Sequence, residues 1–558
     1  MNILLHFIQK TQLFPGRRGW STLVLAMLLW GLLSVQPAYA AEINVPCDTA
    51  GLYAAIATAN GNGAGDTIHL TADCTYTLTG TALEVTNSLT INGNGATIDG
   101  NAQSRVLINE GILTVNNLTI TGGAALGQPG SGFENGGGIF NSSTIYLYGS
   151  TVSGNSATGN GGGIFNRSTV NLYDSTVSGN SAAGDGGGAW NDATLVLHNS
   201  IVSGNTAGGD GGGAWNKNQL DLFDSVVRQN TANRGGGFFA ASNALAYYSV
   251  ITNNHAVAEG GGIYNQAGSY LYNTTIAGNT GTLGDGIFNA NRASLINTTM
   301  VHNGDPATPD LYNPGIVDMK MSIISKCQNL GTVTDNGYNL ISENDGCLNA
   351  ATSFSADPLL EAVQDSNGNL QYYIPQAGSP IINRIPANIC GGYDQIRTQR
   401  PQGAGCEIGS IEIINAAPDC SAVVATPASL WPPNHKFQPI TLSGATDPDG
   451  DSLRLTVTGV MQDEPVDASE ADARIMGGGV EVRAERNGSG NGRVYHIAFT
   501  ADDGFGNACS GTVQVGVPHA KNSTAIDDGP LYDSLVAVQS SAVQAQRTEQ
   551  VFLPLVSR

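Results

Sequence analysis

A triple glycine that returns at a nearly fixed interval is the feature that most restricts the fold of this 558-residue chain. The step from one triplet to the next is 24 or 25 residues. A period this constant indicates one structural unit that stacks on copies of itself. The triplets, and one variant of them, begin at Gly136, Gly161, Gly186, Gly211, Gly235, Gly260 and Gly284.

Each repeat is a series of short strands and turns. Residues 161–180 read GGGIFNRSTVNLYDSTVSGN, in which three runs of β-branched and aromatic residues are separated by Gly, Asn, Asp and Ser. This pattern is typical of strands and turns, and it leaves no room for a helix. Because identical residues one repeat apart favour positions above one another, we predict an all-β fold. Its core is a right-handed parallel β-helix with three-strand coils of about 25 residues, stacked about 4.8 Å apart.

Three columns of the repeat predict the interior and the corners of each coil. We expect Leu to point inward. We expect Asn to lie at corners, where it tolerates left-handed backbone and can hydrogen-bond to its copy in the next coil. The leucine column is Leu147, Leu172, Leu197, Leu222, Ala246, Leu271 and Leu295. The asparagine columns are Asn141, Asn166, Asn191, Asn216, Ala240, Asn265 and Asn289, and Asn155, Asn180, Asn205, Asn230, Asn254, Asn279 and Asn303.

The N-terminus predicts export. Lys10, Arg17 and Arg18 precede an apolar run over residues 23–35, and the small-x-small site Ala38-Tyr39-Ala40 follows. This pattern is typical of a secretory signal peptide over residues 1–40; a single membrane anchor is the alternative, but the run is short for a span. We expect no transmembrane segment in the mature chain.

Eight cysteines fit the same oxidising compartment. Proximity in the sequence suggests four disulfides, and the repeats themselves hold no cysteine, so the bridges would staple the ends of the stack. The predicted pairs are Cys47–Cys74, Cys327–Cys347, Cys390–Cys406 and Cys420–Cys509.

The net charge of −22 argues against nucleic acid as a partner. A chain without a basic surface has no electrostatic footprint for a phosphate backbone, so we expect no nucleic acid.

Changes in pattern divide the chain into six parts. Leu52, Ala55, Ile56 and Ala59 fall at helical spacing, which predicts a helix that covers the open end of the first coil. The predicted parts are the signal peptide (1–40), an N-terminal cap (41–82), the β-helix (83–304), C-terminal coils with a cap (305–415), an immunoglobulin-like β-sandwich (416–518), and a linker with an apolar tail (519–558).

Residues 330–415 resemble a known family. The blocks at 336–341, 357–360, 377–382 and 406–412 look like the choice-of-anchor Q domain of secreted bacterial β-helix proteins. The glycine repeats are also similar to those of polymorphic outer-membrane adhesins, although the adhesin block Phe-x-x-Asn is not clearly kept. These resemblances imply a location outside a bacterial cell or on its surface.

The predicted sandwich carries a second resemblance. Residues 430–436 (LWPPNHK) and 502–507 (DDGFGN) resemble secreted bacterial immunoglobulin-like modules related to the hyalin repeat. Such modules act mainly as spacers or adhesive stalks. The apolar residues 551–556 near the C-terminus are too few to span a membrane, and they predict a sorting tag, a docking strand or an end strand of the sandwich.

An outward aromatic column is the best candidate for a binding site. If Leu147 and its column point inward, the next residue of each strand points outward. Aromatic rings about 5 Å apart on a flat sheet suit stacking on sugar rings; alternatively, they stack on each other and stabilise the sheet beneath a covering segment. The column is Tyr148, Tyr173, His198, Phe223, Tyr247 and Tyr272, with Tyr146 and Tyr270 nearby.

A column of charged residues before the glycines is the candidate for catalysis. Asp185, Asp210, Arg234 and Glu259 follow one another at the repeat interval. Two carboxylates one coil apart suit a retaining glycosidase, but any two stacked residues share that separation. The paired Asp, Gly-His-Gly and Arg-x-Lys blocks of polygalacturonases are missing from the coils. We therefore expect a solvated turn, with a polysaccharide lyase or glycoside hydrolase as the alternative.

The predicted sandwich contains a candidate calcium loop. Asp447, Asp449 and Asp451 alternate around a glycine turn, as carboxylates do in calcium loops of extracellular modules. An acidic surface turn is the alternative. We predict that the protein requires no cofactor and that this loop can bind calcium.

The sequence as a whole favours a secreted or cell-surface, adhesin-like protein without catalysis. We expect it to bind polysaccharide or a cell surface along an exposed face of the β-helix. A lyase or hydrolase is the first alternative, and a structural surface-layer component is the second.

Overall fold

The computed structural model describes residues 39–128, 130–366, 368–466, 470–477 and 479–536. The chain forms two compact units, residues 1–243 and 244–558, and each is described by itself. Most of the predicted signal peptide and the whole apolar tail lie outside the described residues.

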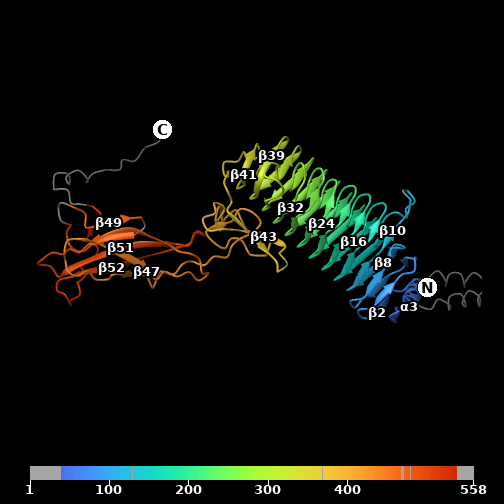
Figure 1. Ribbon diagram of the computed structural model, residues 1–558, viewed down its shortest axis with the longest axis horizontal. Coiled ribbons are helices and arrows are strands. Elements are labelled where there is room, and N and C mark those ends of the chain that lie inside the picture. The colour runs from blue at the N-terminus through green and yellow to red at the C-terminus, as the bar shows by residue number, and fades with distance from the viewer. Residues whose placement is uncertain (1–38, 129, 367, 467–469, 478, 537–558) are drawn as a thin grey trace, which may run out of the picture. The chain divides into compact units, whose positions relative to one another are not determined.

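The first unit is a stack of parallel coils, which confirms the predicted β-solenoid (Figure 1). Four columns of strands run through it, because each full coil adds a two-residue strand to the three predicted strands. The longest strands form the column β1 (Glu42–Val45), β2 (Asp66–Leu70), β5 (Leu89–Asn92), β8 (Ile112–Asn116), β12 (Thr144–Tyr148), β16 (Thr169–Tyr173), β20 (Thr194–His198) and β24 (Gln219–Phe223).

Three further columns of shorter parallel strands complete the coils. The first is β3 (Thr75–Thr77), β6 (Thr97–Asp99), β9 (Thr119–Thr121), β13 (Thr151–Ser153), β17 (Thr176–Ser178), β21 (Ile201–Ser203) and β25 (Val226–Arg228). The second is β4 (Leu83–Val85), β7 (Leu107–Asn109), β11 (Ile139–Asn141), β15 (Ile164–Asn166), β19 (Ala189–Asn191), β23 (Ala214–Asn216) and β27 (Phe238–Ala240). The third is β10 (Ala124–Ala125), β14 (Ser156–Ala157), β18 (Ser181–Ala182), β22 (Thr206–Ala207) and β26 (Thr231–Ala232).

The leucine column lies inside, as predicted. Leu147, Leu172, Leu197 and Leu222 are at most 2% exposed, and successive members of this set pair in register. Strict register is expected here, because a slip by one residue would turn every leucine to the surface.

Both asparagine columns form buried ladders, but their predicted backbone conformation is wrong. Asn180 donates from Nδ2 to Oδ1 of Asn205 at 2.9 Å, and Asn166 donates in the same way to Asn191 at 2.7 Å. Their side chains point into the interior, and neither column has positive φ. The left-handed corners lie instead at Asp174, Asn199 and Asp224 and at the first glycine of each triplet, for example Gly161 at φ 66°. Asn166 and its copies end a strand and keep extended backbone, so the sharp turn falls on other residues; next to Asn180 it falls on Gly179, at φ 62°.

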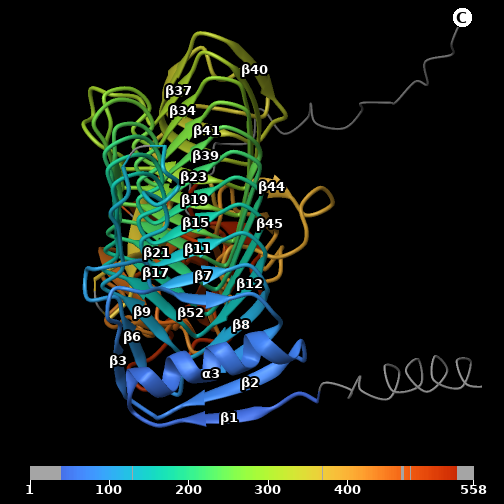
Figure 2. The same ribbon diagram turned by 90° about the vertical axis from the view of Figure 1, so that its right-hand side faces the viewer.

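The predicted N-terminal helix is confirmed as α3 (Thr49–Asn62). The Asp48 side chain accepts from the backbone N–H of Gly51 at 2.6 Å, and Gly63 ends the helix in left-handed backbone at φ 70°. All four residues of its predicted apolar face are buried: Leu52, Ala55, Ile56 and Ala59. Figure 2 shows α3 lying across the end of the first coils, beside β2.

The second unit begins with further coils of the same kind. Its columns are β28 (Ala244–Tyr247), β32 (Gly268–Tyr272), β35 (Arg292–Ile296), β38 (Ile316–Lys320) and β40 (Thr332–Asp335); β29 (Val250–Thr252), β33 (Thr275–Ala277), β36 (Thr299–Val301), β39 (Ile323–Asn329) and β41 (Leu340–Asp345); and β31 (Ile263–Asn265), β34 (Ile287–Asn289) and β37 (Leu311–Asn313), with the short strand β30 (His255–Ala256).

A less regular segment packs against these coils. It contains two antiparallel pairs, β42 (Leu360–Gln364) with β43 (Leu370–Pro375) and β44 (Ile385–Pro386) with β45 (Gly405–Cys406). Ile381, Ile385 and Ile408 join Ile323 and Leu340 of the coils in one buried apolar cluster. The segment therefore covers apolar surface of the last coils, as terminal elements of a solenoid must.

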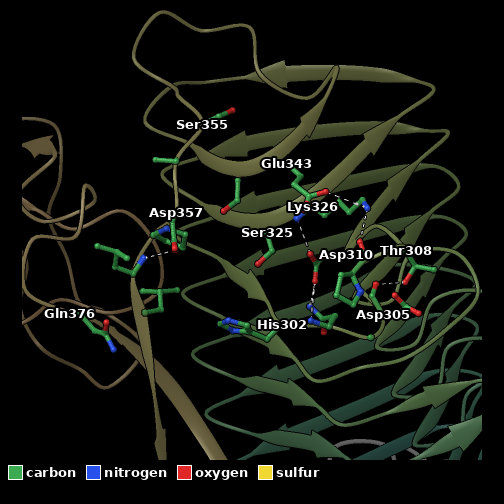
Figure 3. A pocket seen from close by; sticks show the side chains of 18 residues that line it. His302, Asp305, Thr308, Asp310, Ser325, Lys326, Glu343, Ser355, Asp357 and Gln376 are labelled. Atoms are coloured by element: carbon green, nitrogen blue, oxygen red, sulfur yellow. Dashed lines mark hydrogen bonds and ion pairs between the residues drawn. The ribbon is translucent and has the colours of Figure 1, made fainter.

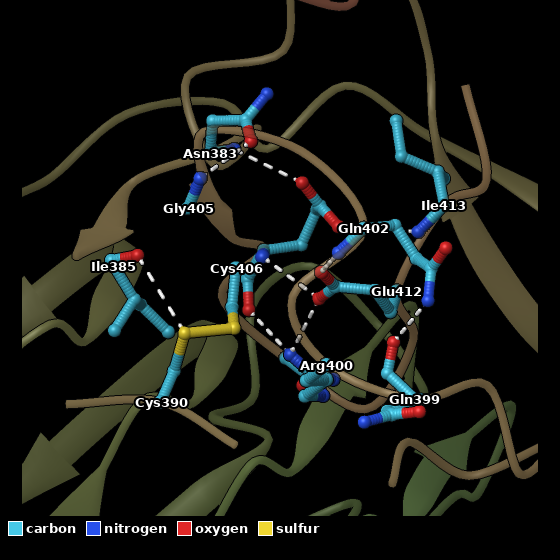
Figure 4. The surroundings of a disulfide bond; sticks show 12 residues. Asn383, Ile385, Cys390, Gln399, Arg400, Gln402, Gly405, Cys406, Glu412 and Ile413 are labelled. Carbon is cyan, nitrogen blue, oxygen red and sulfur yellow. Dashed lines mark hydrogen bonds and ion pairs between the residues drawn. A yellow bond between two sulfur atoms is a disulfide. The ribbon is translucent and has the colours of Figure 1, made fainter. Parts of the chain in front are cut away.

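The interior of this segment holds a buried charged cluster beside the Cys390–Cys406 disulfide (Figure 4). Arg400 donates from Nη1 to Oε2 of Glu412 at 3.2 Å, and both side chains are almost completely buried. Burial, with repulsion from Glu407, raises the pKa of Glu412 to about 8. A raised pKa favours the protonated form of this carboxyl group, which lowers the cost of burying two acids beside one guanidinium.

The C-terminal part of the second unit contains two four-stranded antiparallel sheets, consistent with a β-sandwich. One sheet is β46 (Val424–Thr426), β47 (Phe437–Ser443), β50 (Gly479–Arg483) and β49 (Ala473–Met476); the other is β52 (Ala508–Pro518), β51 (Gly492–Asp502), β48 (Arg454–Gln462) and β53 (Tyr532–Asp533). Their inward residues form one buried core that includes Ile440, Val482, Val460, Ile497 and Val515.

All four predicted disulfides are confirmed, and no described cysteine is free. The bridges are Cys47–Cys74, Cys327–Cys347, Cys390–Cys406 and Cys420–Cys509.

Candidate functional site

The predicted aromatic column of the first unit is half-exposed, but its rings stack on each other. The ring centroids of Tyr148 and Tyr173 are 4.8 Å apart, and those of Tyr173 and His198 are 4.9 Å apart at an interplanar angle of 2°. His198 and Phe223 continue the stack at 4.9 Å. The ring faces are therefore occupied by neighbouring rings, and the edges and hydroxyl groups are what this column offers to a ligand.

In the second unit a later segment of the chain contacts the residues that directly follow this column. The rings of Tyr247 and Tyr272 are tilted by 41° at 5.5 Å. Asn273 donates from Nδ2 to the carbonyl of Tyr393 at 2.7 Å, and the guanidinium of Arg397 lies 3.6 Å from the ring centroid of Tyr248. Burial raises the pKa of Tyr272. Tyr247 and Tyr272 nevertheless remain half-exposed, as Tyr173, His198 and Phe223 do in the first unit.

The charged column before the glycines is a hydrogen-bond ladder. Oδ1 of Asn160 accepts from the backbone N–H of Asp185 at 2.7 Å, and Oδ1 of Asp185 accepts from the N–H of Asp210 at 2.8 Å. Burial raises the pKa of Asp185, and the Asp210 charge adds to this. Each side chain thus fixes the backbone of the next coil, which is a structural role that needs no substrate.

Arg234 ends this ladder in the first unit. Its Nε and Nη2 bind the two carboxylate oxygens of Asp210 at 3.1 and 2.6 Å, and its guanidinium lies 5.1 Å from the ring centroid of Phe239. A guanidinium held in this way is poorly placed to remove a proton. In the second unit Glu259 is half-buried and forms a parallel bridge with Leu283.

A second outward aromatic column was missed by the sequence reasoning. It occupies the middle position of the three-residue strands β11, β15, β19, β23 and β27. The alternation of inward and outward residues along these strands could have revealed it in the sequence. Its rings are stacked at 4.4 to 6.3 Å, and two arginines, Arg105 and Arg167, lie over the ring of Phe140. The column in the first unit is Phe140, Phe165, Trp190, Trp215 and Phe239.

A polar cleft of about 810 Å³ lies on the second unit, and the sequence reasoning missed it as well (Figure 3). Ser325 of β39 and Ser342 of β41 line it from successive coils. Figure 3 shows Ser325 between two walls, one carrying Asp305 and Thr308 and the other carrying Asp357 and Gln376. The walls are loops outside the regular repeat, which explains why no period revealed them.

His302 and Lys326 are the basic residues of the cleft, and both are engaged. The His302 ring stacks on Tyr373 with centroids 5.2 Å apart. Nζ of Lys326 donates to the carbonyl of Pro306 at 2.6 Å and lies 3.3 Å from Oε2 of Glu343. The cleft also contains Asp305, Asp310, Glu343 and Asp357, so acidic residues outnumber basic ones among its lining residues.

Asp310 is the cleft residue with the most altered ionisation. Its Oδ1 accepts from Nδ2 of Asn303 at 2.7 Å, and its Oδ2 accepts from the backbone N–H of Lys326 at 2.8 Å. Burial nevertheless raises the pKa of Asp310 to about 6. Asp310 takes the place of the next asparagine in the buried ladder, so its hydrogen bonds are explained by structure alone.

The predicted calcium-loop residues do lie together. The carboxylates of Asp447, Asp449 and Asp451 offer ligand atoms within 4.8 Å of one another. Oδ1 of Asp447 accepts from the N–H of Asp449 at 2.9 Å, and its Oδ2 is buried without a hydrogen-bond partner among the described residues. Burial and the two neighbouring charges raise the pKa of Asp451. Carboxylate oxygens are ligands that calcium prefers, so the donor set fits the ion.

The comparisons with known proteins give no family. No family model matches the chain, and neither the curated proteins nor the solved structures contain a match. Among the residues that the structure describes, no helix is long and apolar enough to cross a membrane.

Proposed function

We propose that this chain is a secreted or cell-surface protein that binds polysaccharide along its β-helix without catalysis. The polar cleft around Ser325 carries this proposal. A sugar polymer presents hydroxyl groups at short, regular intervals. Hydroxyl, amide and carboxylate groups held on rigid strands are suited to hydrogen-bond with them.

Other features support the location and the role. Four disulfides without a free described cysteine are typical of an oxidising, extracellular compartment. The resemblance of residues 330–415 to a choice-of-anchor Q domain supports attachment to a bacterial surface. An immunoglobulin-like module with calcium at Asp447 would then act as a stiffened spacer, and the half-exposed stretch from Tyr148 to Phe223 would add edge contacts to a glycan.

The proposal is tested by retention of the purified protein on immobilised plant and bacterial polysaccharides, with and without calcium. Ser325→Trp should fill the cleft and abolish retention. Ser178→Trp is the matched control, because Ser178 is the third residue of β17, as Ser325 is of β39, but it lies on the first unit. Retention by Ser325→Trp equal to that of the unchanged protein would refute the cleft as the binding site.

A polysaccharide lyase or glycoside hydrolase remains the second candidate. Several carboxylates in one cleft favour it, namely those of Asp305, Glu343 and Asp357, because a pair of carboxyl groups is needed to cleave a glycosidic bond. The column of Asp185, Asp210, Arg234 and Glu259 is a weaker place for that chemistry, since the ladder and the ion pair occupy its polar atoms. New reducing or unsaturated ends in the retention assay would establish the enzyme and exclude a purely binding role.

A further inference from the structure

A smaller cavity on the first unit contains a single charged residue. It has a volume of about 440 Å³, and Arg105 is the only charged residue among those that line it. Ile108, Leu126 and Phe133 give it apolar walls, and Leu126 and Phe133 are more than 60% exposed at its edge. The polar residues Thr81, Gln103 and Ser104 also line it, so the cavity has both polar and apolar walls.

Arg105 is buried and forms no salt bridge with a described residue. It is 8% exposed, and burial lowers the pKa of its guanidinium, while the charge of Glu134 opposes this shift. Glu134 itself accepts hydrogen bonds from the Gly130 N–H at 3.0 Å and from the Ser131 hydroxyl at 2.9 Å. Burying a charged group without a salt bridge is costly, so a direct carboxylate partner would be favourable here.

The guanidinium is nevertheless held in one orientation. Nε donates to the carbonyl of Asn135 at 2.7 Å, and Nη2 donates to the carbonyl of Gly132. The rings of Phe133 and Phe140 lie on it, with centroids at 5.6 and 4.9 Å. Nη1 donates no hydrogen bond to any described residue, so one edge of the guanidinium retains unused N–H groups.

We propose that this cavity binds a carboxylate group of an acidic sugar, with Arg105 as the anchor. A planar guanidinium presents two parallel N–H groups that match the two oxygens of a carboxylate, and the fixed orientation reduces the entropy lost on binding. The apolar walls would contact the body of the sugar ring. The sugar part of this inference rests on the proposed function, whereas the carboxylate part rests on Arg105 alone.

The inference is tested by titrating the purified protein with glucuronate and, separately, with glucose. Arg105→Gln should weaken glucuronate binding roughly 10- to 100-fold, because a charge-assisted bidentate contact is lost. Arg167→Gln is the matched control. Arg167 also lies over the Phe140 ring, at 5.3 Å, but it is exposed and does not line the cavity. It should leave the affinity within about twofold. Equal binding of glucuronate and glucose by the unchanged protein would overturn the inference.

A second variant keeps the test valid if Arg105→Gln does not fold. Ala82→Trp should fill the cavity from another wall and abolish glucuronate binding without altering any hydrogen bond of Arg105. Unchanged glucuronate binding by this variant would also overturn the inference.

The two proposals can fail separately. Retention of neutral polysaccharides without glucuronate binding would refute only the carboxylate site. Glucuronate binding without retention of any polysaccharide would refute only the proposed function.

Discussion

The buried asparagine ladder gives the sharpest test of how the coils are held together. Asn205 is completely buried, and its Oδ1 accepts from both the backbone N–H and Nδ2 of Asn180, at 3.0 and 2.9 Å. Its own Nδ2 donates to the carbonyl of Val177 at 3.0 Å and to Oδ1 of Asn230 at 2.9 Å. Replacing Asn205 with Leu preserves most of the volume but removes all four hydrogen bonds.

The expected loss of stability follows from the polar groups that the substitution leaves without a hydrogen-bond partner. The two donors of Asn180 and the carbonyl of Val177 lose a partner in a buried site, and each buried unsatisfied group costs about 1–3 kcal/mol. Allowing for relaxation and the added apolar burial, we expect Asn205→Leu to lower the free energy of unfolding by about 3–6 kcal/mol.

Equilibrium urea denaturation and hydrogen exchange measure this effect. The backbone amide of Asn180 should exchange much faster in the variant, because its acceptor is gone. Asn171→Leu is the control, since Asn171 points outward from β16 and pairs in register with Val196, and it should change stability by less than about 0.5 kcal/mol. A loss below about 1 kcal/mol for Asn205→Leu would show that the ladder does not hold the coils together.

Three further predictions concern ionisation, ring stacking and cross-linking. Because burial raises the folded-state pKa of Asp310 from 3.8 to about 6, its contribution to stability is fully present below pH 3.8 and is lost as the pH rises through 6. The pH dependence of unfolding, compared between the unchanged protein and Asp310→Asn, should therefore differ by roughly 3 kcal/mol between these limits, and identical profiles would contradict the assignment. Tyr173→Ser removes two stacked ring contacts, so it should lower stability by about 1–3 kcal/mol in thermal denaturation; an unchanged midpoint would mean that the stack is incidental. Replacing Cys420 and Cys509 with Ser opens a loop with a sequence separation of 89 residues and should cost about 4–5 kcal/mol of sandwich stability in denaturant; a loss under 1 kcal/mol would argue against that bridge as the main cross-link.

The repeat made the coils predictable, because stacking imposes the same environment on every copy of a column. The inward position of Leu172 and the asparagine-to-asparagine bonds followed from the period alone, and both are confirmed. Three disulfides followed from sequence proximity, since they close short loops near the ends of the coils, and Cys420–Cys509 was the pair that remained. The left-handed corners were misplaced because an asparagine column has two explanations, backbone conformation or side-chain ladder, and the sequence does not distinguish them.

The candidate sites were less predictable, because they depend on contacts outside the repeat. The segment that contacts Tyr248 and Asn273, beside the aromatic column, lies more than a hundred residues later, around Tyr393 and Arg397. The cleft at Ser325 needs two irregular loops as walls, and neither loop has a periodic signal. Arg105 forms no salt bridge with a described residue, and a sequence pattern does not predict which charges the fold brings close to a side chain.

The in-register stacking has a consequence for how this chain can change length. Each regular coil of the first unit presents almost the same surface upward and downward, as the matched strands β15, β19 and β23 show. Removing residues 161–185 would therefore join two surfaces that already fit, whereas removing one residue would shift every later side chain to the wrong face. A deletion of 25 residues should be milder than a deletion of one, so whole coils are the natural unit in which such a protein grows or shrinks during evolution.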